Sequence, residues 1–311
     1  PVTTVRPSAG TLAVLQDRLQ QRRFLARIGL PQTKFAPVGA EEEAGPIKGD
    51  IRFPAVLKAR TSGYDGKGQV QVAASEDLVA AHASLGGQPA VLEAMVPFVR
   101  EISVVLARTH DGARKCFPVV ENEHRAGILH ISRVPARLDE GVECRAVEIA
   151  ISIATVMEYV GVMAVEMFVM QDGALLVNEI APRVHNSGHY TLGACVTSQF
   201  EQHIRAICGL PLGDTDLLRP AAMVNLLGEA WLERPEFLAK IASDPAARLH
   251  LYGKQPPLHG RKMGHFLVFG QSADEAAARA EAISNSCGTQ VKPQQQLAGG
   301  GNGVDQHVAG Y

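Results

Sequence analysis

Two apolar runs separated by a short polar turn constrain the fold of this chain more than any other feature. The runs are Val162–Val169 and Ala174–Ile180, and the dipeptide Asp172-Gly173 lies between them. Asp-Gly is favoured in two-residue turns, so we predict an antiparallel β-hairpin with these two residues at its tip. In that register Glu166 lies directly opposite Glu179. The pattern therefore predicts two carboxylates side by side on one face of an apolar hairpin.

Such a pair of carboxylates needs compensation. Directly opposite residues have Cβ atoms about 4.5–5.5 Å apart, and two like charges about 5 Å apart repel by roughly 3 kcal/mol at an effective dielectric of about 20. A divalent cation bound by Glu166 and Glu179 removes this repulsion, and Mg²⁺ accepts carboxylate and phosphate oxygens together. The polar Asn178 beside Glu179 favours this interpretation. The alternatives are a solvated pair on an exposed face, or one glutamate bound by a nearby arginine.

A glycine-rich loop is the second candidate site. Residues Ser62–Gly68 lie between two predicted strands, Phe53–Lys58 and Gln69–Ala73. Glycines let backbone N–H groups approach an anion closely, and Lys58 and Lys67 would add positive charge. The loop is not a Walker A motif, because Lys67 is followed by glycine and then by a strand. We predict a lid over phosphates, with a long hairpin turn as the alternative.

The third candidate is the polar segment Ala181–His189, which follows the strand of the second glutamate. Arg183 can hold a planar oxyanion through two N–H groups, and His185 and Asn186 can hold another at the start of the next helix. The alternative is a zinc site at His185 and His189. We disfavour zinc because no third ligand is evident nearby in the sequence.

Weaker signals come from isolated charged residues. Glu93 and Glu101 are candidates for contacts with the base or sugar of a nucleotide. Arg261-Lys262 precedes a predicted strand and is a candidate for contact with a phosphate or a carboxylate. Solvated surface charge is the alternative for each of these residues.

The remaining sequence alternates predicted helices and strands. Helices are expected at 11–28, Glu76–Leu85, Arg145–Val160, Thr191–Cys208 and Ala273–Ser284, and strands at Ala90–Glu93, Ile102–Arg108 and His265–Phe269. The buried face of the helix at Arg145–Val160 is expected to carry Val147, Ile151, Ala154 and Met157 or Val156. Several neighbouring strands are joined by short turns, which favours a mixed α+β architecture over a parallel sheet.

Composition narrows the class of protein. The 311 residues contain 30 Lys and Arg against 32 Asp and Glu, so the near-neutral charge argues against a nucleic-acid partner. Apolar runs stay far below the roughly 18 residues of a membrane span, and Pro1–Gly10 lacks the pattern of a signal peptide. The five cysteines are scattered without a C-x-x-C pair, which is typical of reduced thiols. We therefore expect two or three domains and a cytoplasmic location without membrane contact.

Together these motifs resemble the ATP-grasp ligases, and within them the family of 5-(carboxyamino)imidazole ribonucleotide synthases. The resemblance runs from about Pro7 to Phe269, and its most specific part is Asn178–His189 followed by Ser198–Glu201. It implies an α+β fold in which two subdomains grip ATP, followed by a small C-terminal domain. The small N-terminal α/β subdomain of the family has no counterpart in this sequence. The implied segments are a connecting helix in 1–40, a lid subdomain in 41–115, a central subdomain with the metal site in 116–210, a small domain in 211–290 and a flexible tail in 291–311.

The resemblance also implies an activity. Members carboxylate 5-aminoimidazole ribonucleotide with ATP and bicarbonate, through carboxyphosphate, in de novo purine (IMP) biosynthesis. The alternatives are another ATP-grasp carboxylate–amine ligase, or a chain that binds Mg-ATP without turnover. A cytoplasmic homodimer is expected.

The family motifs assign roles to individual residues. ATP would be bound by Arg18, Lys58, Gly63, Tyr64, Asp65, Gly66, Lys67, Gly68, Gln69, Glu93, Ala94, Met95, Val96, Glu101, His124, Asn178 and Glu179. Mg²⁺, or Mn²⁺ in its place, would be held by Glu166 and Glu179. Carboxyphosphate would be held by Arg183, His185, Asn186 and Lys262, and aminoimidazole ribonucleotide by Tyr64 and Lys67.

Overall fold

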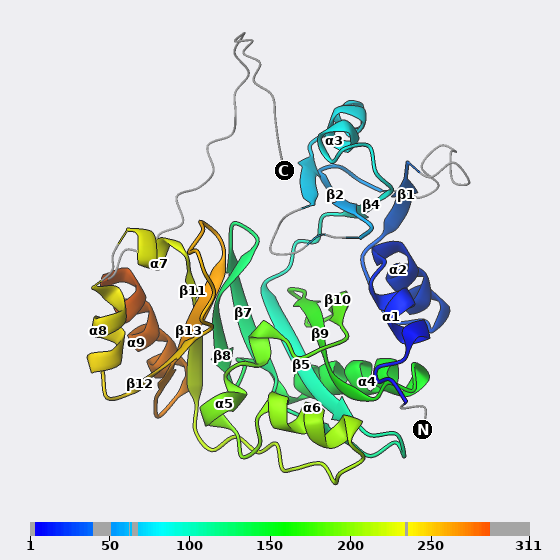
Figure 1. The fold of residues 1–311 in the computed structure, drawn as a ribbon. Helices are drawn as coiled ribbons and strands as arrows, with labels where there is room; N and C mark the ends of the chain where they lie inside the picture. The colour runs from blue at the N-terminus through cyan, green and yellow to red at the C-terminus, as the bar shows by residue number, and fades with distance from the viewer. Residues whose placement is uncertain (1–3, 40–50, 62, 64–67, 234–235, 287–311) are drawn as a thin grey trace.

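The chain folds into two antiparallel sheets of different size (Figure 1). The computed structural model describes residues 4–39, 51–61, 63, 68–233 and 236–286. The four-stranded sheet has the order β1 (Phe35–Val38), β4 (Ala90–Ala94), β2 (Ala55–Ala59) and β3 (Gln69–Val72). The nine-stranded sheet has the order β10 (Leu175–Ala181), β9 (Gly161–Val169), β5 (Arg100–Arg108), β7 (Val120–Arg125), β8 (Ile128–Val134), β11 (Ala221–Leu227), β13 (Lys262–Phe269) and β12 (Ala247–Leu251), with β6 (Arg114–Cys116) paired to β5. The predicted α+β architecture is confirmed.

Helices pack against both sheets, and on both faces of the larger one. They are α1 (Ala9–Leu15), α2 (Arg18–Arg27), α3 (Leu78–Ser84), α4 (Glu140–Val156), α5 (Thr191–Ala194), α6 (Gln199–Ile207), α7 (Glu229–Leu232), α8 (Phe237–Ser243) and α9 (Ala273–Ser286). Side chains of β5 alternate between two cores, because successive strand residues point to opposite faces. Val104 packs in the core with α2 and α4, whereas Val105 packs in the core with α5. In Figure 1, α8 and α9 cover the β11–β13 end, and α3 lies against the small sheet.

The prediction of one helix over 11–28 is wrong, because the chain breaks at Asp17. The Asp17 carboxylate accepts hydrogen bonds from the backbone N–H groups of Leu19 and Gln20 at 2.9 and 3.3 Å, which starts α2 as a new helix. The same carboxylate pairs with Arg60 at 2.6 Å. A helix periodicity that continues across a cap conceals such a break.

Two further helix predictions need correction. The helix expected over Thr191–Cys208 is split into α5 and α6, because Cys195 forms a β-bridge with Leu217 and Ser198 caps α6. The helix expected at Arg145–Val160 starts earlier and ends at Val156, since Glu158 adopts a left-handed conformation with φ of 46°.

The buried face of α4 also differs from the predicted one. It carries Val142, Ala146, Ala150, Ile153 and Ala154, and of the predicted residues only Ala154 is fully buried. The side chain of Val156 is 53% exposed. The face was misassigned because the predicted helix began too late and omitted Val142.

The carboxylate hairpin is confirmed, but its predicted two-residue turn is wrong. The N–H of Met170 donates to the carbonyl of Ala174 at 2.8 Å across a three-residue loop, and the β9–β10 register is consequently displaced by one residue. A β-bulge between Val177 and Glu179 then restores the register, so that Glu179 faces Glu166 after all. Without this bulge, Asn178 would lie opposite Glu166.

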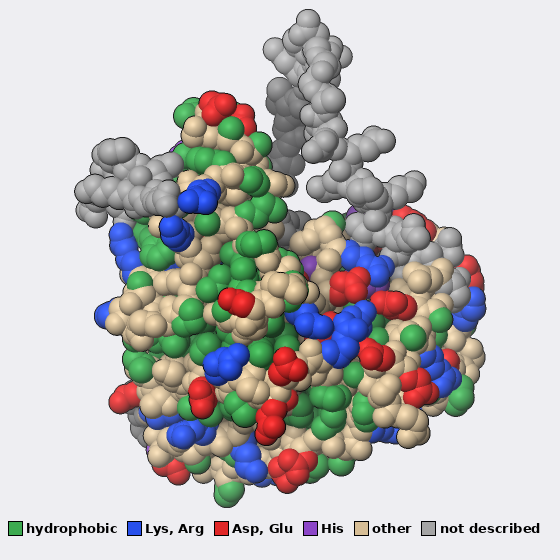
Figure 2. Space-filling view, turned by 180° about the vertical axis from the view of Figure 1, so that it is seen from behind, with side chains coloured by type: hydrophobic (Ala, Val, Ile, Leu, Met, Phe, Trp, Pro, Cys, Tyr) green, Lys and Arg blue, Asp and Glu red, His purple; other side chains and the backbone are tan. Residues whose placement is uncertain are grey.

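Surface charges of the larger sheet are interspersed rather than gathered. On the face seen in Figure 2, Lys and Arg side chains lie among Asp and Glu side chains. Charged side chains of this sheet also pair with each other, as Arg133 does with Glu123 and with Glu281 of α9 at 3.2 and 3.1 Å. Within the described ranges, none of the helices combines the length and apolar character needed to cross a membrane.

Candidate active site

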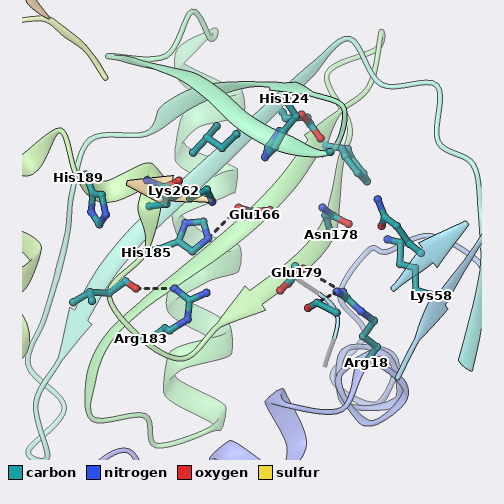
Figure 3. A pocket seen from close by; sticks show the side chains of 18 of the residues that line it. Arg18, Lys58, His124, Glu166, Asn178, Glu179, Arg183, His185, His189 and Lys262 are labelled. Carbon is teal, nitrogen blue, oxygen red and sulfur yellow. Dashed lines mark hydrogen bonds and ion pairs between the residues drawn. The ribbon is translucent and has the colours of Figure 1, made fainter. Parts of the chain in front are cut away.

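A cavity of about 610 Å³ brings most of the predicted site residues together. Its lining comes from α2, from β2 and β3 of the small sheet, from β5, β7, β9, β10 and β13 of the large sheet, and from the segment after β10 (Figure 3). Thirteen predicted residues contribute: Arg18, Lys58, Gly63, Gln69, Glu101, His124, Glu166, Asn178, Glu179, Arg183, His185, Asn186 and Lys262.

Other predicted residues are placed differently. Gly68, Glu93, Ala94, Met95 and Val96 are not part of the cavity lining. Tyr64, Asp65, Gly66 and Lys67 lie outside the described residues, as does the predicted tail. The predicted role of these residues therefore stays a prediction.

Glu166 and Glu179 lie at the centre of the cavity, on neighbouring strands (Figure 3). Their side chains are 18% and 43% exposed, so Glu166 is the more buried of the two. Arg18 on α2 donates to Glu179 at 3.2 Å. Burial, and next the charge of Glu179, hold the pKa of Glu166 well above its usual range. This arrangement stores a repulsion that a bound cation would relieve.

His185 faces Glu166 as a neutral ring. Burial, and next the charge of Arg183, lower its pKa to about 3. Its Nδ1 accepts from the backbone N–H of Ser187 at 3.3 Å, so the ring proton resides on Nε2. Nε2 lies 3.3 Å from Glu166 Oε1. The imidazole therefore orients Glu166 without adding charge to the cavity.

Buried amides hold the segment that carries His185 and Asn186. Gln199 at the start of α6 accepts from the His185 N–H at 2.9 Å and donates to the His185 carbonyl at 2.7 Å. Asn186 and Asn225 of β11 exchange two amide hydrogen bonds of 2.9 and 2.7 Å. Asn225 also donates to the carbonyl of Leu129 at 2.7 Å. Gln199 lies in the segment Ser198–Glu201 that carried the family resemblance, but the sequence assigned it no role. Asn225 was not singled out, although it stands alone among apolar residues in β11, which is a detectable signal.

Glu101 and His124 face each other across β5 and β7. His124 Nδ1 lies 2.6 Å from Glu101 Oε2. Burial opposes protonation of His124, but the hydrogen bond and the charge of Glu101 outweigh it and raise its pKa. The two side chains form a polar pair that can meet the hydroxyl groups of a nucleotide sugar.

Lys58 and the buried Glu93 form the cationic end of the site. Lys58 Nζ lies 2.7 Å from one oxygen of Glu93, and the other oxygen accepts from Arg22 at 2.7 Å. Burial opposes ionisation, yet these two cations lower the pKa of Glu93 to about 2. Glu93 is thus an ionised carboxylate that holds Lys58 in place.

Additional residues line the cavity at the end nearest the C-terminal strands. Tyr252 and Lys254 follow β12 and join His189 and Lys262 there. Burial, and next the charge of Lys262, lower the pKa of His189 to about 4. Neither Tyr252 nor Lys254 was singled out from the sequence, because the loop after β12 has no distinctive spacing.

Comparison with known proteins defines the class. The family model of the ATP-grasp domain matches residues 23–200, and that of the phosphoribosylaminoimidazole carboxylase C-terminal domain matches residues 221–279. The fold and the carboxylate-centred cavity are therefore those of an ATP-grasp ligase.

Similar proteins define the family within that class. The N5-carboxyaminoimidazole ribonucleotide synthase of Bacillus subtilis (strain 168) is 44% identical over 267 residues, which are 85% of this chain and 69% of the relative. An ADP complex of an N5-carboxyaminoimidazole ribonucleotide synthetase superposes with a TM-score of 0.81 at 42% identity, over 88% of this chain and 71% of that chain. The Aspergillus clavatus enzyme in complex with ADP and 5-aminoimidazole ribonucleotide superposes with a TM-score of 0.83 at 28% identity, over 91% and 76% of the two chains. This chain belongs to the N5-carboxyaminoimidazole ribonucleotide synthase family, as its motifs predicted.

Proposed function

We propose that this ATP-grasp ligase uses ATP and bicarbonate to carboxylate 5-aminoimidazole ribonucleotide, giving the N5-carboxyamino product of de novo purine biosynthesis. The observation that carries the proposal is the pair Glu166 and Glu179, opposite each other in a cavity with cations on both sides. Lys58 and Arg18 lie on one side, and Arg183 and Lys262 on the other (Figure 3). Such a cavity can hold two anionic reactants next to each other.

The two glutamates fit Mg²⁺, with Mn²⁺ as a substitute. Their carboxylate oxygens are hard donors, and the pKa of Glu166 is raised by burial and by the charge of Glu179 in spite of the opposing charges of His124 and Lys262. Within the described ranges, no group of three or more His, Cys, Asp or Glu side chains is arranged to hold a metal. Mg²⁺ suits such an incomplete set, because it keeps waters and takes phosphate oxygens as further ligands. When bound, it would offset the negative charge of the transferring phosphoryl group.

The small sheet and α2 would bind the ATP phosphates. Lys58 and Arg18 supply the charge, and Gly63 supplies a backbone close to Arg18, whose Nη2 lies 3.4 Å from the Gly63 carbonyl. Glu101 would accept hydrogen bonds from the sugar hydroxyls, with His124 holding its carboxylate. Tyr64 to Lys67 would complete the lid. In this proposal the γ-phosphate would lie between the small sheet and the two glutamates.

The segment after β10 would hold bicarbonate. Arg183 and Lys262 supply charge, and Asn186 supplies an amide fixed by Asn225. An oxygen of bicarbonate attacks the γ-phosphorus, the bond to the ADP oxygen breaks, and carboxyphosphate forms. The exocyclic amine of the ribonucleotide then attacks the carboxyl carbon, phosphate departs, and the amine proton passes to that phosphate. Both steps would be accelerated by positioning of the reactants and by stabilisation of their negative charge, as expected for phosphoryl transfer.

The ribonucleotide would enter from the end lined by His189, Tyr252 and Lys254. Lys254 is a cation for its phosphate, and Tyr252 and His189 offer flat surfaces near the aminoimidazole. Tyr64 and Lys67 are proposed to reach it from the lid. A cytoplasmic homodimer without nucleic-acid or membrane partners completes the proposal.

One assay tests the proposal against its alternatives. ADP release is measured with Mg²⁺, ATP and bicarbonate, with and without 5-aminoimidazole ribonucleotide, and the carboxylated product is captured with labelled bicarbonate. We expect ADP release that depends on bicarbonate and label incorporation that depends on the ribonucleotide. ADP release that requires a different amine acceptor would identify another ATP-grasp ligase. Binding of Mg-ATP without any formation of ADP would identify a non-catalytic protein.

A further inference from the structure

We infer that Arg22 is a positioning residue: its guanidinium fixes Lys58 through Glu93 and at the same time holds the β10 bulge that brings Glu179 opposite Glu166. The inference rests on the proposed function of these three residues. None of the sequence motifs assigned Arg22 a role.

The contacts of Arg22 run in three directions. It lies on α2 with a side chain that is only 3% exposed. Nε donates to Glu93 at 2.7 Å, Nη1 to the carbonyl of Val177 at 2.9 Å, and Nη2 to the carbonyl of Asn178 at 2.8 Å. All three guanidinium nitrogens therefore have partners, and the partners belong to different sheets.

On the side of the small sheet, Arg22 acts through Glu93. The buried Glu93 carboxylate lies on β4 and binds Arg22 with one oxygen and Lys58 of β2 with the other. Both contacts are 2.7 Å long. Removing Arg22 leaves Lys58 as the sole partner of a buried carboxylate, so Lys58 would be drawn toward Glu93 and away from phosphate.

On the side of the large sheet, Arg22 holds the bulge itself. β10 is an edge strand. On its outer edge the N–H of Val177 already donates to the carbonyl of Pro31 at 2.8 Å, and the carbonyls of Val177 and Asn178 are left for other partners. Arg22 binds the carbonyls of Val177 and of the bulged Asn178. The neighbouring Gln21 binds the N–H and the carbonyl of Ile180 at 3.0 and 3.2 Å. Two consecutive side chains of α2 thus take the place of an adjacent strand on both sides of Glu179.

The spacing of α2 explains how one helix reaches both targets. Arg18 and Arg22 are four residues apart, so they share a face of the helix. Arg18 contacts the side chain of Glu179, while Arg22 contacts the backbone just before it. A lysine at position 22 keeps the charge but is a single point donor, and it cannot match a planar fork that serves three acceptors.

The test is a charge-preserving substitution, Arg22→Lys, with Arg27→Lys as the matched control on the same helix. Arg27 is exposed and lies 5.6 Å from the ring of Phe24, outside the cavity lining. Binding of ADP is followed by calorimetry over a Mg²⁺ titration. We expect the Mg²⁺ concentration for half-maximal ADP binding to rise about tenfold in Arg22→Lys, the order seen when residues behind metal ligands are changed. Arg27→Lys should remain within about twofold of wild type.

An unfolded fraction in Arg22→Lys would itself raise the half-saturation point, by the inverse of the folded fraction. The folded fraction is therefore measured by circular dichroism under the same conditions, and the midpoint is corrected for it. A second variant, Glu93→Gln, breaks the link to Lys58 and leaves the bulge contacts in place. It should weaken ADP binding without moving the Mg²⁺ midpoint. An unchanged midpoint in Arg22→Lys would overturn the inference. Because ADP binding needs no turnover, loss of carboxylation in the wild type would contradict the proposed function alone.

Discussion

Behind Lys58, which lines the cavity, the buried carboxylate of Glu93 lies between two cations, whereas at the centre of the cavity the half-buried Glu166 faces a second carboxylate and a neutral histidine. The pKa of Glu93 is accordingly lowered to about 2, and that of Glu166 is raised. The first carboxylate is compensated by the protein itself. The second is compensated only in part, by His124 and Lys262, and a bound cation would complete the compensation, which is the pattern expected of a functional group.

The two carboxylates also differ in what they contribute: Glu93 contributes to the stability of the fold, and Glu166 to the candidate site. A buried charge that has its partners in the fold stabilises the ionised form and resists change. A buried charge without them lowers stability until a ligand binds. Substitutions at Glu93 and at Glu166 should therefore have opposite effects on the ligand-free protein.

The largest effect is expected from neutralising the central pair. Glu166→Gln or Glu179→Gln should reduce bicarbonate-dependent ADP formation by at least about a thousandfold, because the charge that balances the phosphoryl transfer is lost. Far-ultraviolet circular dichroism should remain that of the wild type. The exposed Glu148 of α4 provides the control, and Glu148→Gln should retain full activity. Turnover near the wild-type rate in both cavity variants would refute the metal assignment.

Removing the charge of Glu93, which balances Arg22 and Lys58, should lower the stability of the protein. Glu93→Gln should lower the free energy of unfolding by about 3 kcal/mol, because Arg22 and Lys58 then remain buried without an anion. The amide still accepts one hydrogen bond, which keeps the loss at the lower end of the range for such pairs. Urea denaturation measures it. A loss below about 1 kcal/mol, as for an exposed ion pair, would contradict the assigned burial of this carboxylate.

Neutralising Glu166 at the centre of the cavity should have the opposite effect on the free energy of unfolding. Without Mg²⁺, Glu166→Gln should raise the free energy of unfolding by about 1–2 kcal/mol at about pH 8 and have little effect at about pH 5. The folded pKa of Glu166 lies above its unfolded value, so between the two the folded state binds more protons. Stability of the wild type therefore falls as the pH rises through this window. Urea denaturation of the wild type and the variant at the two pH values measures this difference. If Glu166→Gln is less stable than the wild type at about pH 8, the expected contrast with Glu93→Gln does not hold.

Local patterns in the sequence predicted the elements that carry the chemistry. The apolar runs of β9 and β10 and the lone polar residues within them gave the hairpin and its carboxylates, because strand periodicity is a local property. The facing of Glu166 and Glu179 was predicted correctly through two deviations that offset each other, a longer turn and the bulge at Asn178. Turn chemistry predicts a loop only to within a residue, and nothing local marks the bulge.

Contacts between distant segments were not predictable in this way. Arg22 binds partners 71, 155 and 156 positions away, and its place in an amphipathic helix looks like ordinary solvated charge. Gln199 and Asn225 are similar, since their roles depend on which strand or loop the fold brings beside them. The breaks at Asp17 and Cys195 were missed because helix periodicity continues through them. The sequence thus identified side chains that line the cavity better than the side chains that hold them in place.

Asn225 tests that distinction with the smallest expected effect. Asn225→Ala removes the amide that pairs with Asn186 and donates to the carbonyl of Leu129. Lost hydrogen bonds of this kind cost about 1 kcal/mol, so the KM for bicarbonate should rise about fivefold as Asn186 loses its fixed orientation. The KM for ATP should stay within about twofold, because Asn225 is far along the sheet order from the strands that carry the phosphate-binding residues. Steady-state kinetics at saturating ribonucleotide resolves the two constants. Equal increases in both would show that Asn225 supports the whole cavity rather than its bicarbonate end.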